Sequence, residues 1–226
     1  MAVEAEASLL QVETLSALAA ATNLETASEA AQPVVGGEYQ EMAGNILAQL
    51  VPGRPAVLMF TSPGDGHGKT TILVRLAPAL AQRVQGEVLL VDANVRHPDL
   101  AAQFGLEATC GLSDVLRGTT TWSDAVRPTA VPRLSLLPGG RVEAGESTAI
   151  ERSDPGPLFG ELSRRYALIL VDAASLAHPE AASIVRCSDS VYLVTRLGQS
   201  TARLVREAAQ AIQGCRGRLA GCIAVA

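Results

Sequence analysis

The feature that most constrains this chain is the stretch from Ala56 to Thr71, which reads Ala-Val-Leu-Met-Phe-Thr-Ser-Pro-Gly-Asp-Gly-His-Gly-Lys-Thr-Thr. Its first five residues form an apolar run of strand length, and residues 72–80 after it have the leucine spacing of a helix. Strand, glycine-rich turn, lysine and helix is the order of a phosphate-binding loop. Glycines at 64, 66 and 68 let backbone N–H groups converge on a phosphate, and the helix N-terminus adds a partial positive charge. The stretch therefore predicts a phosphate site.

The residues of this loop have distinct expected roles. Lys69 is expected to reach the β- and γ-phosphates, and the Thr70 hydroxyl to bind Mg²⁺. Lys69 is the only lysine among 18 basic residues, and a compact ammonium suits a triphosphate. The strict pattern Gly-x-x-x-x-Gly-Lys-[Ser/Thr] fails at Pro63, so a glycine-rich turn with a chance lysine is the competing interpretation. We expect the nucleotide to be bound by Ser62, Gly64, Asp65, Gly66, His67, Gly68, Lys69, Thr70 and Thr71, with the His67 side chain facing solvent.

Composition limits the class of protein. A chain of 226 residues with 48% hydrophobic and 3% aromatic residues can form one sizeable α/β domain with an aliphatic core. Residues 1–32 hold five acids and no base, so the remainder is balanced, and no nucleic-acid partner is expected. The four cysteines show no metal-ligand spacing, which indicates reduced, partly buried thiols in a cytosolic protein. No apolar run is long enough to span a membrane, and no leader pattern precedes one.

The chain divides into two parts. Residues 1–36 read as an acidic extension, and residues 37–226 as a P-loop domain. Apolar residues recur at intervals of three between Leu9 and Leu18, which allows a short amphipathic helix, but the composition favours a disordered extension. A linker at 33–37 leads into a helix expected at 39–50.

Apolar runs alternate with helical patterns along the rest of the chain. Strands are expected at 56–60, 87–91, 134–137, 167–171, 191–195 and 219–225, and further helices at 72–80, 111–118, 157–165 and 201–213. Residues 138–157 read as a long polar loop. This alternation predicts an α/β fold with a doubly wound, mostly parallel sheet, helices on both faces and right-handed crossovers.

Two aspartates follow expected strands. Asp92 ends the run after the loop helix, and Asp172 follows Leu-Ile-Leu-Val. Ligands of such sheets lie outside the carboxyl ends of the strands, so both aspartates should converge on the loop. Phosphoryl transfer needs a phosphate cradle, Mg²⁺ and a carboxylate that orients or deprotonates the nucleophile. We therefore take Lys69, Asp92 and Asp172 as candidate catalytic residues, Thr70, Asp92 and Asp172 as candidate Mg²⁺ ligands, and ATP with Mg²⁺ as the cofactors.

The motifs together resemble those of the bacterial tyrosine kinases that work with capsule and exopolysaccharide export machinery. Residues 89–98, Leu-Leu-Val-Asp-Ala-Asn-Val-Arg-His-Pro, are similar to the second aspartate motif of that family, Asp-Ala-Asp-x-Arg-x-Pro. Residues 104–106, 111–118, 136–140, 166–172 and 193–198 are similar in type and order. The resemblance covers about residue 37 to the C-terminus. It implies ATP-dependent tyrosine phosphorylation, nucleotide contacts by Arg96 and Arg196, and a separate membrane-spanning polysaccharide co-polymerase or activator as partner.

Several departures from the family bear on activity. Asn94 stands where the motif has its second aspartate, and Ala173-Ala174-Ser175 replaces the usual Thr-Pro-Pro. Gln40 and Ala43 stand where the ring-forming helix often carries arginines. The only tyrosines are Tyr39, Tyr166 and Tyr192, so the usual tail cluster is missing.

Three functions stay open at this point. The first is a cytoplasmic tyrosine kinase, recruited to the inner face of the membrane by its partner. The second is a degenerate ATP-binding regulatory subunit of the export complex. The third is a partition or division-site ATPase, although Gly64 stands where those proteins carry a signature lysine. A homo-oligomer is left open.

Overall fold

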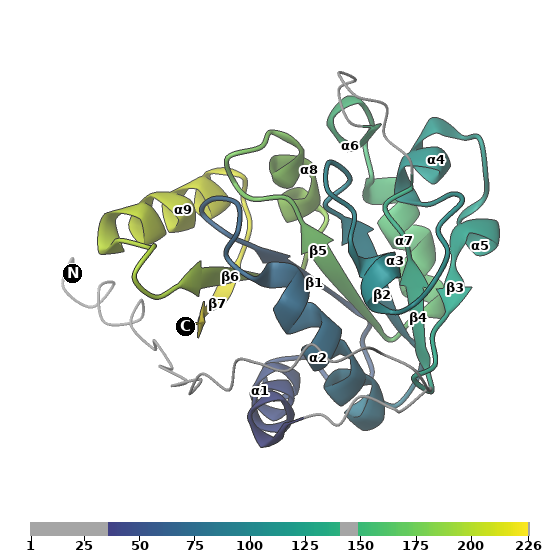
Figure 1. Cartoon of the computed structure of the whole chain (residues 1–226), viewed down its shortest axis with the longest axis horizontal. Coiled ribbons are helices and arrows are strands. Elements are labelled where there is room, and N and C mark those ends of the chain that lie inside the picture. The colour runs from purple at the N-terminus through teal and green to yellow at the C-terminus, as the bar shows by residue number, and fades with distance from the viewer. Residues whose placement is uncertain (1–35, 141–148, 226) are drawn as a thin grey trace.

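The computed structural model describes residues 36–140 and 149–225 of the chain (Figure 1). A seven-stranded sheet in the order β3-β4-β2-β5-β1-β6-β7 forms its middle layer. Every neighbouring pair is parallel except β3 with β4. Helices cover both faces of the sheet, so the expected doubly wound α/β class is confirmed.

The sheet consists of β1 (Ala56–Thr61), β2 (Val88–Ala93), β3 (Arg127–Pro128), β4 (Leu134–Leu137), β5 (Leu168–Ala173), β6 (Ser190–Arg196) and β7 (Leu219–Val225). Every residue of the three central strands β1, β2 and β5 is buried. Their sequences are near-continuous aliphatic runs because helices cover both faces of a parallel sheet. Only their carboxyl ends carry polar groups, and these groups build the site.

The helices form two layers, each with its own apolar cluster. On one face lie α1 (Gly37–Ala48), α2 (Lys69–Arg83) and α3 (Leu100–Gln103). On the other face lie α4 (Leu112–Arg117), α5 (Trp122–Ala125), α6 (Ala149–Arg152), α7 (Gly156–Arg165), α8 (Glu180–Arg186) and α9 (Ala202–Gly214). Strand residues alternate between the two clusters, as the pleat of a strand requires.

The expected strands and helices are all present, with ends shifted by a few residues. The sequence missed β3 and the short helices α3, α5, α6 and α8. An element of two to seven residues completes too few turns to show a period, so tertiary contacts decide it. Helix α6 interrupts the expected loop at 138–157, and residues 141–148 of that loop, like the expected N-terminal extension up to residue 35, lie outside the described residues.

The register of β5 places the two candidate carboxylates side by side. Strand β5 pairs with β1 on one side and β2 on the other. Asp172 is the direct partner of Asp92 on β2 and of Phe60 on β1. The phosphate loop follows β1 immediately, so it and both aspartates meet at one edge of the sheet.

Close backbone contacts between the end of β4 and α4 build the far side of this edge. The Leu112 N–H donates to the Pro138 carbonyl at 2.7 Å, and the Ser113 N–H to the Gly139 carbonyl at 3.1 Å. A Cβ on Gly111 would lie 2.2 Å from Pro138 O and 2.4 Å from Gly140 N. Gly111 has an extended backbone, so the need for glycine here comes from close packing.

Replacing Gly111 with alanine should destabilise the domain by about 2 kcal/mol or more, because overpacking against backbone atoms typically costs 1–3 kcal/mol. Gly160→Ala is the matched control, since no heavy atom lies within 4 Å of a Cβ there and the position is helical. It should raise the free energy of unfolding by about 0.5–1 kcal/mol. Urea denaturation measures both, and equal stability of Gly111→Ala and wild type would contradict the packing argument.

Candidate functional site

The phosphate loop joins β1 to α2 with the backbone geometry that its glycines allow. Gly66 and Gly68 have φ values of 77° and 82°, which residues with a Cβ rarely adopt. Gly68 is the N-cap of α2, so the helix N-terminus opens directly onto the loop. The loop thus combines a glycine cradle and a helix dipole, which favours an anion.

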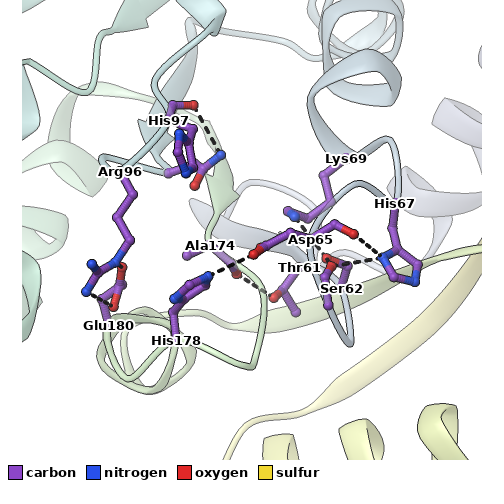
Figure 2. A network of polar contacts seen from close by, with 12 residues as sticks. Thr61, Ser62, Asp65, His67, Lys69, Arg96, His97, Ala174, His178 and Glu180 are labelled. Carbon is purple, nitrogen blue, oxygen red and sulfur yellow. Dashed lines mark hydrogen bonds and ion pairs between the residues drawn. The ribbon is translucent and has the colours of Figure 1, made fainter.

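Lys69 lies at the base of the loop with 6% of its surface exposed. Its Nζ donates to Ser62 Oγ at 2.8 Å, and Ser62 Oγ donates to the Gly64 carbonyl at 2.5 Å (Figure 2). Burial lowers the Lys69 pKa, and the nearby charges of Asp172 and Asp65 oppose this. The ammonium is therefore held inside the loop by one neutral hydroxyl, and no carboxylate of the described residues is in salt-bridge contact with it.

Asp172 is joined directly to the first turn of α2. Thr70 Oγ1 donates to Asp172 Oδ2 at 2.6 Å. Burial raises the Asp172 pKa to about 6, while this hydrogen bond and the Lys69 charge act in the opposite direction. Asp172 Oδ1 is buried and has no hydrogen-bond partner within the described residues. A buried carboxylate oxygen without a donor is costly unless a cation or a donor reaches it.

Asp92, beside Asp172, has both of its oxygens occupied by its own loop. Oδ1 accepts from the Asn94 N–H at 3.2 Å, and Oδ2 accepts from the N–H groups of Asp99 and Leu100 at 3.1 Å each. Burial, together with the Asp172 charge, raises the Asp92 pKa to about 8, against the effect of these three donors. The carboxylate therefore organises residues 94–100 and begins α3.

Asn94 and Arg96 make contacts away from the phosphate loop. Asn94 Nδ2 donates to the His97 carbonyl at 3.2 Å, a contact that an aspartate cannot make. Arg96 Nε donates to the buried carboxylate of Glu180 at 2.6 Å (Figure 2). Its Nη2 lies 3.8 Å from Glu151 Oε2. Arg96 thus ties the loop after β2 to α8, and its contact with a nucleotide stays a prediction.

The expectation that His67 faces solvent is wrong. Its side chain is 6% exposed, and Nδ1 lies 2.9 Å from Gly64 O and 3.0 Å from Asp65 O. Both neighbours are carbonyls, which only accept, so Nδ1 must carry a proton. Nε2 lies 3.1 Å from Ser200 Oγ in the segment between β6 and α9. Residue type alone could not show this, because the partner on the far side is 133 residues away.

The segment after β5 holds the other side of the loop. His178 Nε2 contacts Asp65 Oδ2 at 3.0 Å, and the Leu176 N–H donates to the Ser62 carbonyl at 2.9 Å (Figure 2). The neighbouring Ser175 and His178 side chains lower the Asp65 pKa. The sequence prediction missed His178 and Glu180, since the only signal there was a departure from the expected Thr-Pro-Pro.

The remaining predicted residues lie on two sides of the loop. Arg196 ends β6, and its Nη2 would lie 3.9 Å from a Cβ on Gly68. Its Nε is buried without a partner in the described chain. The Thr71 side chain is exposed on the first turn of α2. The structure therefore gathers Lys69, Thr70, Asp172 and Arg196 around the loop.

The donor set fits a magnesium nucleotide. Mg²⁺ usually takes one or two protein oxygens and completes its shell with phosphate and water. Thr70 Oγ1 and the unpartnered Asp172 Oδ1 provide such oxygens beside the phosphate cradle. No group of three or more histidine, cysteine, aspartate or glutamate side chains suited to a metal occurs in residues 36–140 and 149–225.

Comparison with known proteins identifies the family. Residues 57–214 match the sequence model of a family described as cellulose biosynthesis protein BcsQ. The chain belongs to this BcsQ family. It is also 28% identical over 187 residues to the tyrosine-protein kinase YwqD of Bacillus subtilis, covering 82% of this chain and 78% of YwqD.

Further relatives of this BcsQ-family chain confirm the resemblance to bacterial tyrosine kinases. The tyrosine-protein kinase wzc of Salmonella typhimurium is 31% identical over 150 residues, which is 66% of this chain but only 21% of wzc. The crystal structure of the VpsO kinase domain superposes with a TM-score of 0.73 at 28% identity, covering 83% of this chain and 92% of that domain. The septum site-determining protein MinD of Pyrococcus horikoshii, solved with Mg-ADP, shares the fold with a TM-score of 0.64 at 24% identity, covering 74% of this chain and 69% of MinD.

The metal-free protein should lose stability as the pH rises from about 5 to about 8. The folded-state pKa values of Asp172 and Asp92, about 6 and about 8, lie above the reference value of 3.8. The native chain then binds more protons than the unfolded chain in this window, so the free energy of unfolding falls with rising pH. Denaturant titrations at several pH values measure it. Asp172→Asn should flatten the curve, whereas a wild-type stability that rises through the window would contradict the assignment.

Proposed function

We propose that this chain binds MgATP at the carboxyl edge of its sheet and works as a tyrosine-kinase-type ATPase of polysaccharide production. The observation that carries the proposal is the contact between Thr70 and Asp172, which leaves Asp172 Oδ1 unpartnered beside a lysine-bearing phosphate loop. The names of its relatives, tyrosine-protein kinases and a cellulose biosynthesis protein, support the reaction and the pathway class.

The roles in the site follow from the atoms available. Lys69 would leave Ser62 and contact the β- and γ-phosphates, while the loop N–H groups and the α2 N-terminus hold the phosphate chain. Thr70 and Asp172 would hold Mg²⁺, which supplies charge neutralisation at the phosphates. Arg196, at the end of β6, lies close enough to the loop to add a positive charge beside Gly68.

A slow enzyme, or a regulatory subunit that responds to bound nucleotide, is the second candidate function. The specific observation is that both carboxylate oxygens of Asp92, the candidate base, accept hydrogen bonds from backbone N–H groups of its own loop. Asn94 adds no charge and donates to His97 O. Fewer carboxylates are thus free to orient a nucleophile. This favours slow turnover and a role in which bound ATP changes the conformation of the protein.

The setting of this activity is also a proposal. No helix of the described residues is both long and apolar enough to cross a membrane. The partner that the resemblance to bacterial tyrosine kinases implies, a separate membrane-spanning polysaccharide co-polymerase, would bring the chain to the inner face of the membrane. The fold shared with MinD keeps a partition-type switch as an alternative, but Gly64 occupies the place of the signature lysine.

Replacing Lys69 with methionine should weaken MgATP binding about tenfold to a hundredfold, because a charge-assisted contact worth roughly 1.5–3 kcal/mol is lost from a buried site. Isothermal titration calorimetry measures the affinity. Arg206→Met, at an exposed position on α9, is the matched control and should bind as wild type does. Equal MgATP affinity of Lys69→Met and wild type would contradict the proposed nucleotide site.

Changing Asn94 to aspartate should raise ATPase or tyrosine-kinase turnover about tenfold or more. At about 5 Å and an effective dielectric of about 20, a unit charge is worth roughly 3 kcal/mol near a cation, and half of that changes a rate about tenfold. Asn94→Ala is the control, because it also removes the contact with His97 O but adds no charge. Turnover is measured with saturating MgATP, and a vigorous wild type that gains nothing from Asn94→Asp contradicts the slow-enzyme proposal.

A further inference from the structure

The end of the domain opposite the nucleotide site carries a surface of exposed arginines. In this parallel fold, the six parallel strands begin at that end and the crossover helices α2, α7, α8 and α9 finish there (Figure 1). Eight exposed arginines lie in these strand starts and helix ends, and we call them the basic end: Arg54, Arg83, Arg133, Arg164, Arg165, Arg186, Arg216 and Arg218.

None of these arginines forms an ion pair with a carboxylate within residues 36–140 and 149–225. Arg133 donates to the carbonyls of Val84 and Gln82, and Arg218 donates to Ser190 Oγ. Elsewhere in the described chain Arg96, Arg117 and Arg203 do pair with carboxylates, whereas Arg75, Arg127, Arg152, Arg196 and Arg206 do not. The basic end therefore has no direct ion pair in the part of the chain that the structure describes, although Glu87 and Asp189 lie at the same edge, directly before β2 and β6.

Helix dipoles explain only part of this arrangement. Cations stabilise the last turn of a helix, which covers Arg83, Arg164, Arg165 and Arg186. The other four arginines lie in the segments before β1, β4 and β7. Meanwhile Asp65, Asp92, Asp99, Asp172 and Glu180 gather at the opposite edge. The balanced charge of residues 33–226 therefore conceals a partial separation of charge between the two ends of the domain.

We propose that the acidic residues 1–32 of this same chain dock on the basic end. They contain Glu4, Glu6, Glu13, Glu25 and Glu29 and no basic residue, which makes them complementary to it in charge. They lie outside the described residues, but the point where they join the domain is known. Gly36 precedes α1, whose Gln40 Nε2 donates to Gln82 Oε1 at 3.0 Å in the last turn of α2.

The described chain begins at Gly36, next to the basic end. Arg83 donates to the Gln40 carbonyl, so α1 enters the domain next to a member of the basic end. A tether of about thirty residues can span roughly 100 Å when extended, which exceeds the width of the domain. Binding within one chain acts at an effective concentration in about the millimolar range, so weak charge pairing suffices.

Other anionic partners fit this surface less well. Stable binding to a lipid surface usually combines charge with inserted apolar groups. Within the described chain the exposed large apolar side chains are Val51 and Leu197, and only Val51, 63% exposed, lies near the basic end. Single-stranded nucleic acid is usually held by stacked aromatic side chains as well as charge. Tyr166 at this end is buried under Arg165, and the neighbouring Trp122 is half-buried with its Nε1 donating to Glu161.

Photo-cross-linking in the full chain tests the proposal. Val12 is replaced by p-benzoylphenylalanine, and the adducts are mapped by mass spectrometry on the monomer. We expect adducts on peptides that contain Arg54, Arg164 or Arg216. Their yield should fall at least fivefold in 1 M salt, where the screening length is about 3 Å, and in a variant with all five glutamates changed to glutamine.

Two sets of arginine variants complete the test. Arg54→Gln, Arg164→Gln and Arg216→Gln combined remove no side-chain hydrogen bond recorded in the described chain, so the fold should persist, and adduct yield should fall at least fivefold. Arg203→Gln with Arg206→Gln, on the exposed face of α9, should leave it unchanged. Adducts mapped to the phosphate loop, adducts only between chains, or a yield indifferent to charge would overturn the proposal. Wild-type binding to phosphatidylglycerol vesicles without adducts would assign the basic end to lipid instead.

Discussion

The hydrogen bond from Thr70 to Asp172 joins the two parts on which this structure depends. Thr70 belongs to the helix that follows the phosphate loop, and Asp172 ends the central strand β5. Asp172 is 1% exposed, and one of its oxygens has no partner within the described residues. Burying such a carboxylate is unfavourable without a cation. The domain therefore has an uncompensated negative charge at the position where the Mg²⁺ of a magnesium nucleotide would bind. The site is thus organised for a ligand, because no group of the described chain makes the contact that the ligand would provide.

The surroundings of the loop make it a connecting element of the domain. Asp65 reaches His178 on the segment after β5, and His67 reaches Ser200 on the segment after β6. The segment after β5 continues to Glu180, which holds Arg96 on the loop after β2. A conformational change in the phosphate loop would therefore affect three connecting segments, those after β2, β5 and β6. This continuity suits a protein that passes its nucleotide state to a partner, as does the reduced set of carboxylates around Asp92.

The net charge of the domain conceals an uneven distribution of charge between the two edges of the sheet. Carboxylates gather at the carboxyl ends of the strands, where a cation is needed, and arginines without an ion pair among the described residues gather at the other end. Both follow from the single direction of the parallel strands, which sends every strand end to one edge and every crossover helix end to the other. The same topology that builds the site therefore leaves a cationic surface opposite it.

The sequence alone determined the fold class, the phosphate loop and the two aspartates, because glycine spacing, aliphatic runs and strand ends are local signals. The short elements were beyond it, since β3 and α3 are stabilised by pairing and by Asp92 rather than by a period of their own. The tertiary structure decided what the side chains do. In the folded chain the His67 side chain points inward, Arg96 pairs with Glu180, and both carboxylate oxygens of Asp92 accept backbone hydrogen bonds. These outcomes depend on partners up to 133 residues away, and only the folded sheet brings such partners within hydrogen-bond distance.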